Sequence, residues 1–112
     1  MTFNASLVIE YISKGNIFIC TKNGEIPYCK IDKCPRQCVA DLLEQITGIK
    51  VNPYVHDWIT IELTDVVYEK ESETVYIIYV CRIAEKLELK EECVWSDYST
   101  VKSKLEKIKS LI

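Results

Sequence analysis

The amino-acid sequence predicts an α+β domain with a mixed β-sheet. Segments rich in β-branched and aromatic residues recur along most of the chain, which is typical of strands. Only two segments have apolar residues at the spacing of an amphipathic helix. The expected order is three strands, a helix, three strands and a final helix. With 112 residues the chain has the length of a single domain, and we expect residues 1–112 to form it around one core.

The N-terminal part is predicted to form two strands and the start of a third. Ser6 to Ser13 and Ile17 to Thr21 are apolar and rich in β-branched residues, and Lys14-Gly15-Asn16 forms a turn between them. Asn23-Gly24 is a strong hairpin signal, because both residues tolerate positive φ angles. Glu25 to Tyr28 begins another extended segment, in which a proline favours a sheet edge or a strand end.

A helix is predicted to begin at Cys34-Pro35 and to end at Gly48. Proline suits the first helical position because its missing N–H has no partner there, and glycine suits a left-handed C-cap. Apolar residues at i, i+3, i+4 and i+7 form one face of this helix: Val39, Leu42, Leu43 and Ile46. The opposite side carries polar residues: Asp41, Glu44 and Gln45.

The second half of the chain is predicted to contain a hairpin. Trp58 to Leu63 and part of Val75 to Ile83 alternate in the way that half-buried strands do. The polar stretch Lys70 to Glu73 lies between them and is expected to be the turn that joins the pair.

A short strand and a final helix are predicted after this hairpin. A charged connection, Leu87 to Glu92, leads to the apolar strand Cys93 to Trp95. Either Ser96 or Asp97 is expected to cap the helix that follows. The apolar stripe of that helix consists of Val101, Leu105, Ile108 and Leu111 or Ile112.

Composition and charge argue against several classes of protein. The formal net charge is −3, so bulk electrostatics give no support for non-specific nucleic-acid binding. No apolar run approaches the length of a membrane span, and the N-terminus lacks the basic and then apolar pattern of a signal peptide. We therefore expect a cytoplasmic protein with no membrane contact. The six cysteines are then expected to be reduced thiols and not a disulfide framework.

Five segments carry a family resemblance: Gly15 to Cys20, Ile26-Pro27, Pro35, Leu43 to Ile49 and Glu91 to Tyr98. They are distributed along nearly the whole length of the chain, and they resemble the Nudix (MutT-like) domain family. Family members have an early strand pair, an L-P-G-G loop, a helix of the form S-P-E-E-A-x-x-R-E-L-x-E-E-T-G-L, a later hairpin and an E-x-x-W turn into a C-terminal helix. The resemblance implies a mixed β-sheet sandwiched between helices.

The resemblance also implies a catalytic helix from which the metal-binding residues are missing. In the family, glutamates on one face of this helix hold divalent cations, usually Mg²⁺, against a diphosphate, so that water attacks phosphorus. With Gly48 as the anchor, the three glutamates fall on Leu42, Gln45 and Ile46, and the family's arginine falls on Asp41. Hydrocarbon side chains do not ligate cations, and an amide brings no charge. We therefore expect a degenerate Nudix box, no family-type pyrophosphohydrolase activity and no cofactor.

The loop before the helix departs from the family pattern as well. Its glycine pair falls on Tyr28 and Cys29, and the loop is about two residues shorter than the common form. In the family register, Leu42 and Ile46 point into the cleft that normally holds metal and phosphate. Apolar residues there must be covered by the domain itself, by a ligand or by another chain.

Displaced carboxylates are the first weak candidates for a remaining metal site. Asp41 and Glu44 lie at i, i+3 and share a helix face, and Glu91 and Glu92 lie where some family members keep a late catalytic carboxylate. The alternative is that both pairs are solvated surface charges. If they act, the protein is an atypical Mg²⁺-dependent hydrolase of nucleoside-diphosphate derivatives.

Cys29-x4-Cys34-x3-Cys38 is the second weak candidate for a metal site. Thiolates bind Zn²⁺, although structural zinc sites usually have C-x2-C spacing. The alternative is three small apolar residues in a loop and a helix. Cys34 precedes a proline at a helix N-terminus, where a thiol pKa falls. A fourth metal ligand would come from Cys20, Cys81, Cys93 or His56.

Binding is the leading functional hypothesis. Tyr28, Trp58 and Trp95 are candidates for stacking a nucleobase or for a protein interface, although most aromatic residues of such a domain fill its core and rim. Together with the apolar cleft positions Leu42 and Ile46, they favour a catalytically inactive domain. Such a domain binds a protein partner, forms a homodimer or binds a nucleotide.

Overall fold

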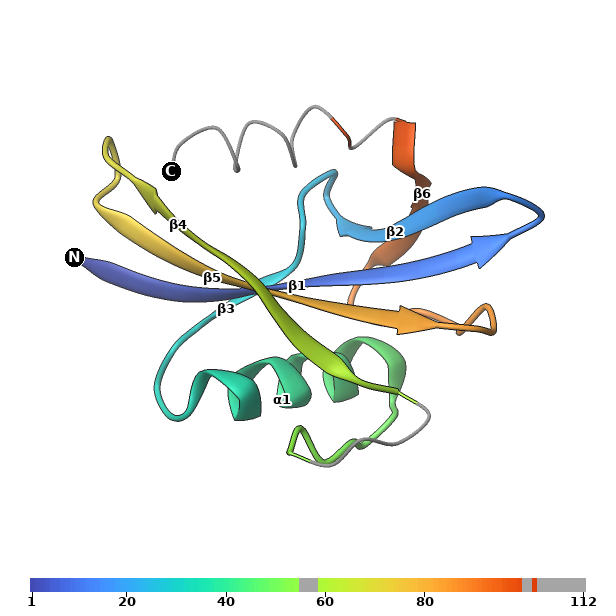
Figure 1. Ribbon diagram of the computed structural model, residues 1–112, viewed down its shortest axis with the longest axis horizontal. Coiled ribbons are helices and arrows are strands. Elements are labelled where there is room, and N and C mark those ends of the chain that lie inside the picture. Colours follow the sequence, from blue (N-terminus) through green and yellow to red (C-terminus); the bar gives the residue numbers. More distant parts are fainter. Residues whose placement is uncertain (55–58, 100–101, 103–112) are drawn as a thin grey trace.

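The computed structural model describes residues 1–54, 59–99 and 102. Within this part of the chain, six strands form one sheet and one helix packs on it (Figure 1). The predicted order of elements is confirmed as far as the last strand, and so is the α+β class. The elements in chain order are β1 Thr2–Ser13, β2 Asn16–Lys22, β3 Tyr28–Lys30, α1 Pro35–Thr47, β4 Ile61–Glu69, β5 Thr74–Ile83 and β6 Cys93–Asp97.

β1 is the central strand of the sheet (Figure 1). The strand order is β4-β5-β1-β2-β6, and the short β3 pairs with the N-terminal part of β1. β1 runs parallel to β5, whereas the other strand pairs are antiparallel, which makes the sheet mixed as predicted. Every residue from Asn4 to Ile9 is buried, so β1 has contacts on both faces of the sheet.

Two strand boundaries near the N-terminus differ from the prediction. β1 begins at Thr2 and not at Ser6, because it pairs with β5 from its first residue onward, a partner that comes much later in the chain. The third strand is Tyr28–Lys30, whereas an extended segment was expected from Glu25. Glu25 instead closes the hairpin turn, where it exchanges backbone hydrogen bonds of 2.8 and 3.0 Å with Lys22.

The predicted hairpin between β4 and β5 is confirmed, but β4 lies later than Trp58 to Leu63. It spans Ile61–Glu69 and pairs with β5 across the predicted polar turn. A β-bulge between Leu63 and Asp65 shifts the register by one residue. The alternation of apolar and polar residues that marks a strand in the sequence therefore breaks at the bulge. Trp58 lies outside the described residues.

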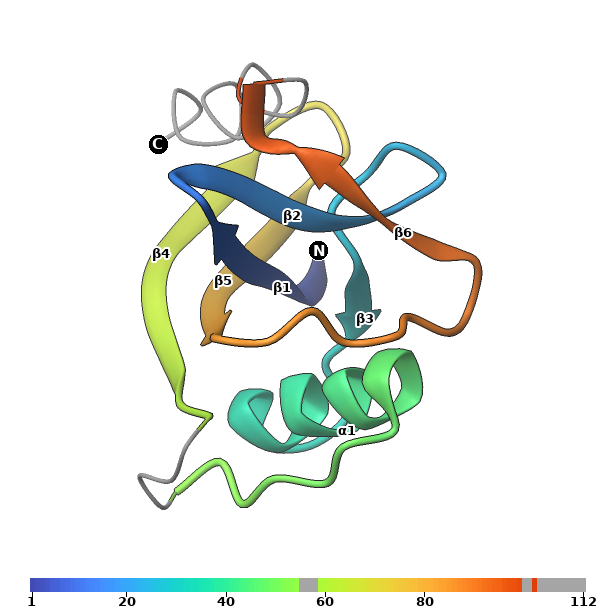
Figure 2. The same cartoon turned by 90° about the vertical axis from the view of Figure 1, so that its right-hand side faces the viewer.

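The helix α1 has the boundaries and the buried face that the sequence predicts. Gly48 ends it in the left-handed conformation (φ 77°), and the N–H of Gly48 donates to the carbonyl of Glu44 at 2.7 Å. The helix lies against one face of the sheet, where it shares the main core with alternate residues of β1 (Figure 2). Its predicted apolar residues are all buried there: Val39, Leu42, Leu43 and Ile46.

β6 leads into the segment for which the final helix is predicted. The Asp97 carboxylate accepts hydrogen bonds of 2.9 Å from both the N–H and the hydroxyl of Ser99, as a helix cap does. Ser96 instead shares a hydrogen bond of 2.7 Å with Thr21 of β2. In the described part of the chain, no helix is long and apolar enough to cross a membrane. The predicted apolar stripe lies outside the described residues: Val101, Leu105, Ile108, Leu111 and Ile112.

Candidate functional site

A cavity of about 470 Å³ lies between α1, the β2–β3 connection and the turn before β6. Segments that are distant in the sequence line it. The β2–β3 connection contributes residues between Lys22 and Cys29, and the turn before β6 contributes Glu91. The helix contributes the residues that fall on the family's glutamates, so this cavity corresponds to the catalytic cleft of the Nudix resemblance: Leu42, Gln45 and Ile46.

The helix wall of the cavity is built into the core. Leu42 is 9% exposed and Ile46 is 1% exposed, and both belong to the main apolar cluster. The domain itself therefore covers these side chains, without a ligand or another chain. Gln45 is exposed beside them. One amide and two hydrocarbon side chains do not fit a Mg²⁺ ion, which requires oxygen ligands and favours carboxylates.

Two carboxylates line the cavity among the described residues, and neither lies on α1: Glu25 and Glu91. Glu91 is a candidate predicted from the sequence, whereas Glu25 is not. Glu25 follows the Asn23-Gly24 turn, and its N–H donates to the carbonyl of Lys22 at 3.0 Å. The hairpin signal could have found it, because a tight turn places the residue after it beside the loop that leads to the helix.

The turn that carries Glu91 is held against the end of α1. The N–H of Lys90 donates to the carbonyl of Ile46 at 2.6 Å, and the N–H of Cys93 donates back to the carbonyl of Lys90 at 3.1 Å. Between them, Glu91 and Glu92 both adopt positive φ angles, 58° and 61°. Such angles cost a residue with a side chain roughly 1–2 kcal/mol. The hydrogen bond from Lys90 to the end of the helix thus holds a strained turn in place, and this turn positions Glu91 at the cavity.

Glu92→Gly is expected to stabilise the domain by about 1 kcal/mol, because glycine adopts a positive φ without steric cost. Glu92 does not line the cavity, so the change leaves the cavity wall intact. Urea unfolding of both proteins measures the difference. Glu71→Gly is the matched control, since Glu71 is an exposed turn residue without a positive φ. An equal gain in the control would show that the φ angle of Glu92 is not the cause.

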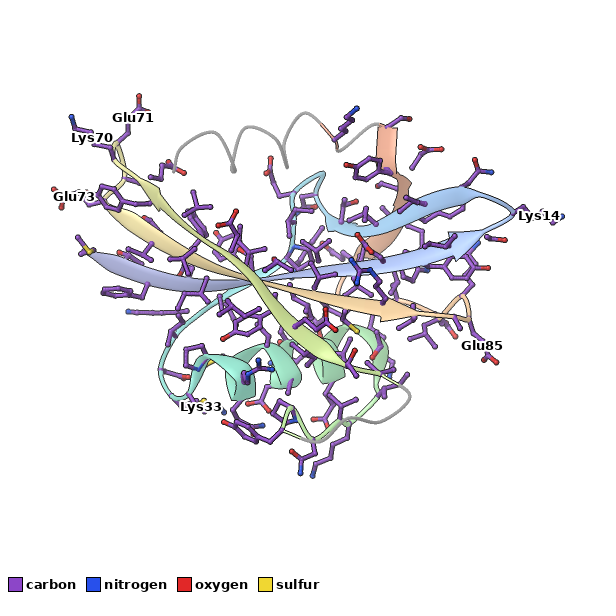
Figure 3. The ribbon with its side chains drawn as sticks, viewed as in Figure 1. Lys14, Lys33, Lys70, Glu71, Glu73 and Glu85 are labelled. Carbon is purple, nitrogen blue, oxygen red and sulfur yellow. The ribbon has the colours of Figure 1, made fainter. Side chains whose placement is uncertain are left out.

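A smaller cavity of about 160 Å³ adjoins the first and contains Asp41. The Asp41 carboxylate forms an ion pair with Lys33, whose side chain lies beside the start of α1 (Figure 3), and accepts a hydrogen bond of 2.9 Å from Gln37. Lys33 and then Gln37 hold the pKa of Asp41 below its usual value. Glu44 is exposed and lines neither cavity. The helix pair Asp41 and Glu44 is therefore separate from Glu91.

Of the three cysteine candidates, Cys29 and Cys38 lie together at the smaller cavity, whereas Cys34 does not line it. The Cys29 thiol donates to the carbonyl of Cys38 at 3.6 Å, and the Cys38 thiol donates to the carboxylate of Asp32 at 3.6 Å. Burial raises the pKa of Cys29 to about 11. In residues 1–54, 59–99 and 102, no three His, Cys, Asp or Glu side chains are grouped where they could hold a metal ion.

Cys34 is exposed at the N-cap of α1, and its thiol pKa lies below the ordinary value. The main cause is Tyr54, whose hydroxyl donates to the Cys34 sulfur at 2.8 Å. The backbone N–H groups of Arg36 and Gln37, in the first turn of the helix, lower the pKa further. The direction agrees with the sequence prediction, but the larger cause comes from a residue beyond the helix.

The aromatic candidates have different surroundings. Tyr28 is 58% exposed at the rim of the cavity between α1 and the β2–β3 connection, and its ring meets that of Tyr76 edge-on, with centroids 6.3 Å apart. Trp95 packs against the core with its ring 5.7 Å from that of Tyr11, and its indole N–H donates to the carbonyl of Leu87 at 2.9 Å. Tyr28 therefore presents an aromatic surface to the cavity, whereas Trp95 is a packing residue. The remaining candidates lie outside the described residues: Trp58 and His56.

No protein-family model matches the sequence, and no curated protein matches it. The fold, however, is similar to solved structures. The C-terminal domain of mouse MUTYH, crystallised in complex with human PCNA, has a TM-score of 0.73 and 11% identity over 99% of this chain and 86% of that chain. The NUDIX domain of Shewanella oneidensis NrtR, complexed with ADP ribose, has a TM-score of 0.65 and 14% identity over 97% of this chain and 84% of that chain.

A MutT/nudix family protein from Enterococcus faecalis is similar as well, with a TM-score of 0.66 and 14% identity over 86% of this chain. The chain spans 43% of the length of that protein. At these identities the likeness concerns the fold, and the predicted Nudix-like fold is confirmed.

Proposed function

We propose that this chain is a non-catalytic Nudix-like domain that acts by binding, in the first place to a protein partner. One observation carries the proposal. Where the family pattern has three metal-binding glutamates, the cavity wall has Leu42, Gln45 and Ile46, and two of these side chains are part of the core. At these three positions the helix therefore offers no carboxylate to a diphosphate-bound cation.

Two similar structures support binding as the mode of action. The MUTYH domain was crystallised with a protein, PCNA, and the NrtR domain with a nucleotide derivative, ADP ribose. For this chain the protein partner is favoured because several large apolar side chains are exposed on its strands, among them Leu63, Val66 and Tyr68. A homodimer would use the same kind of surface.

An atypical hydrolase of nucleoside-diphosphate derivatives is the second candidate function. It is favoured by Glu91, a carboxylate outside the helix that lines the same cavity as Leu42, Gln45 and Ile46. Glu25 lines this cavity as well. These two residues would have to hold the cation in place of the missing box glutamates. In this case Glu91→Gln abolishes turnover, whereas Glu92→Gln, outside the cavity, does not.

Thermal unfolding with a panel of nucleotides and nucleotide-sugar diphosphates, each with and without Mg²⁺ or Mn²⁺, tests the proposal. A ligand present at a hundred times its dissociation constant adds about 2.7 kcal/mol to the stability, which is easily measured. We expect no metal-dependent shift and no hydrolysis product. A metal-dependent shift that is lost in Glu91→Gln would overturn the proposal in favour of the hydrolase. A metal-independent shift would keep a binding function but assign it to a nucleotide.

A further inference from the structure

We propose that the outer edge of β4 binds an extended peptide in which apolar and basic residues alternate. The inference rests on the proposed function, since it assigns a surface and a partner chemistry to the binding role. β4 is an end strand of the sheet: among the described residues it pairs with β5 alone (Figure 1). An end strand presents backbone N–H and C=O groups to which another strand can be added.

The helix side of β4 carries exposed apolar side chains. Three β4 residues pair with β5 on this side: Leu63 with Tyr79, Val66 with Ile77 and Tyr68 with Val75. Tyr79 and Ile77 pack in the main core that α1 shares, and Val75 is the next residue on the same face of β5. The exposed fractions of the three β4 residues are 52%, 48% and 40%, because the helix covers only part of this face. Phe3 of β1, beside Val75 in the register, extends the row and is 48% exposed. Apolar side chains of an added strand would pack here.

The other side of the same strand carries acidic side chains on either side of Val67, which is fully buried in the second apolar cluster. The pairing register places Glu62, Asp65 and Glu69 on the face opposite to Leu63, Val66 and Tyr68. The strand Ile61–Glu69 contains no lysine or arginine. Arg82 of β5 approaches Glu62 at 3.9 Å, so this acid has a distant cationic neighbour. A partner strand would therefore set its apolar residues on the helix side and its basic residues on the acidic side.

The acidic face also argues against a second copy of this chain as the partner. Antiparallel pairing of two β4 strands would bring the acidic side chains of both copies together on one face, and like charges in neighbouring strands are destabilising. The tip of the hairpin does not offset this, because its turn adds one lysine and two glutamates, Lys70, Glu71 and Glu73 (Figure 3). Charge thus selects a basic partner.

A cavity of about 520 Å³ lies at the start of the strand. It is bounded by Leu63 and Ile61 on β4, by Arg36 at the start of α1 and by Tyr54, which is 63% exposed. The Arg36 guanidinium donates to the Ile61 carbonyl at 2.8 Å, so the first backbone acceptor of the strand is already occupied. The bulge between Leu63 and Asp65 interrupts the register next. We therefore place the added strand along Val66 to Glu69. There it would replace the Asp65 carboxylate, which accepts a hydrogen bond of 2.9 Å from the N–H of Val66.

The test uses short capped peptides and the intact domain. One peptide alternates valine and lysine, a second alternates valine and glutamate, and a third is the lysine peptide with a proline at its centre. We expect the lysine peptide to bind at least about tenfold more tightly than the other two, and to shift the backbone amide resonances of β4. Equal binding of the three peptides, or shifts confined to other elements, would overturn the proposal.

Variants of the domain locate the interaction. Val66→Lys is expected to weaken binding of the lysine peptide about tenfold, and Val94→Lys, on the exposed part of the other end strand, to leave it unchanged. Asp65→Lys combined with Glu69→Lys is expected to reverse the preference toward the glutamate peptide, which a merely structural role would not do. Equal effects of the two valine variants, or a dimer that Val66→Lys dissociates, would contradict the proposal.

These outcomes are separate from those of the nucleotide panel. Metal-dependent hydrolysis with intact peptide binding would overturn the proposed function and leave the β4 surface in place. Absence of hydrolysis together with absence of peptide binding would overturn only the β4 surface.

Discussion

Ile46→Glu is expected to unfold the domain or to leave it barely stable. The change restores one glutamate of the family pattern, but Ile46 is 1% exposed in the main core. A buried carboxylate without a partner costs about 3 kcal/mol or more, and a domain of this size has only about 5–15 kcal/mol of total stability. Circular dichroism and thermal unfolding measure the loss directly.

Gln45→Glu is the matched control for this prediction. It restores the neighbouring glutamate of the same pattern, but Gln45 is exposed, so the free energy of unfolding is expected to change by no more than about 0.5 kcal/mol. A folded Ile46→Glu protein with the wild-type melting temperature would contradict the burial of this face. If that variant also gained stability from Mg²⁺, the cleft would be a metal site that needs only its ligands restored.

Cys34 is expected to react with iodoacetamide far faster than the other five cysteines. It is the one exposed cysteine of the six, and its pKa is lowered, whereas burial raises the pKa of Cys29 to about 11 and that of Cys81 to about 12. The thiolate is the nucleophile. A cysteine whose pKa is lower by one therefore has about ten times more thiolate near neutral pH. Peptide mass spectrometry after brief alkylation should find the label almost entirely on Cys34.

The pH dependence of this reaction identifies the cause of the lowered pKa. The alkylation rate of Cys34 should rise with pH and reach half of its maximum below the pKa of an ordinary cysteine, since the folded state favours the thiolate. Tyr54→Phe removes the hydroxyl that donates to the sulfur, so the midpoint should move to higher pH. Tyr28→Phe, another exposed tyrosine, should leave it unchanged. A midpoint unmoved by Tyr54→Phe would assign the effect to the helix N-terminus alone.

Local sequence chemistry was sufficient for the elements whose ends depend on neighbouring residues. The helix begins at Pro35 and ends at Gly48 because proline and glycine act on the backbone within a turn of their own position. The Asn23-Gly24 turn forms for the same reason, with φ angles of 53° and 77°. Elements that pair over long distances were predicted less well. β4 ends six residues later than expected, because its register is set by β5 and interrupted by a bulge.

Given the family resemblance, the sequence also predicts which helix positions fall on the family's box glutamates, because Gly48 anchors the comparison. Their burial could not be read. Leu42 and Ile46 are covered because they pack in the main apolar cluster, against which Leu87 and Leu89 of the connection before β6 also pack, and the N–H of Lys90 donates to the carbonyl of Ile46.

The sequence by itself therefore determined the class of fold and the helix, both of which follow from local propensity and spacing. Only the tertiary structure decided which residues share a site. Glu25 and Glu91 line one cavity, the Tyr54 hydroxyl donates to the Cys34 sulfur, and β4 has its exposed apolar and its acidic side chains on opposite faces. The physical reason is that these neighbours are joined by sheet pairing and packing between segments far apart in the chain, which no local pattern encodes.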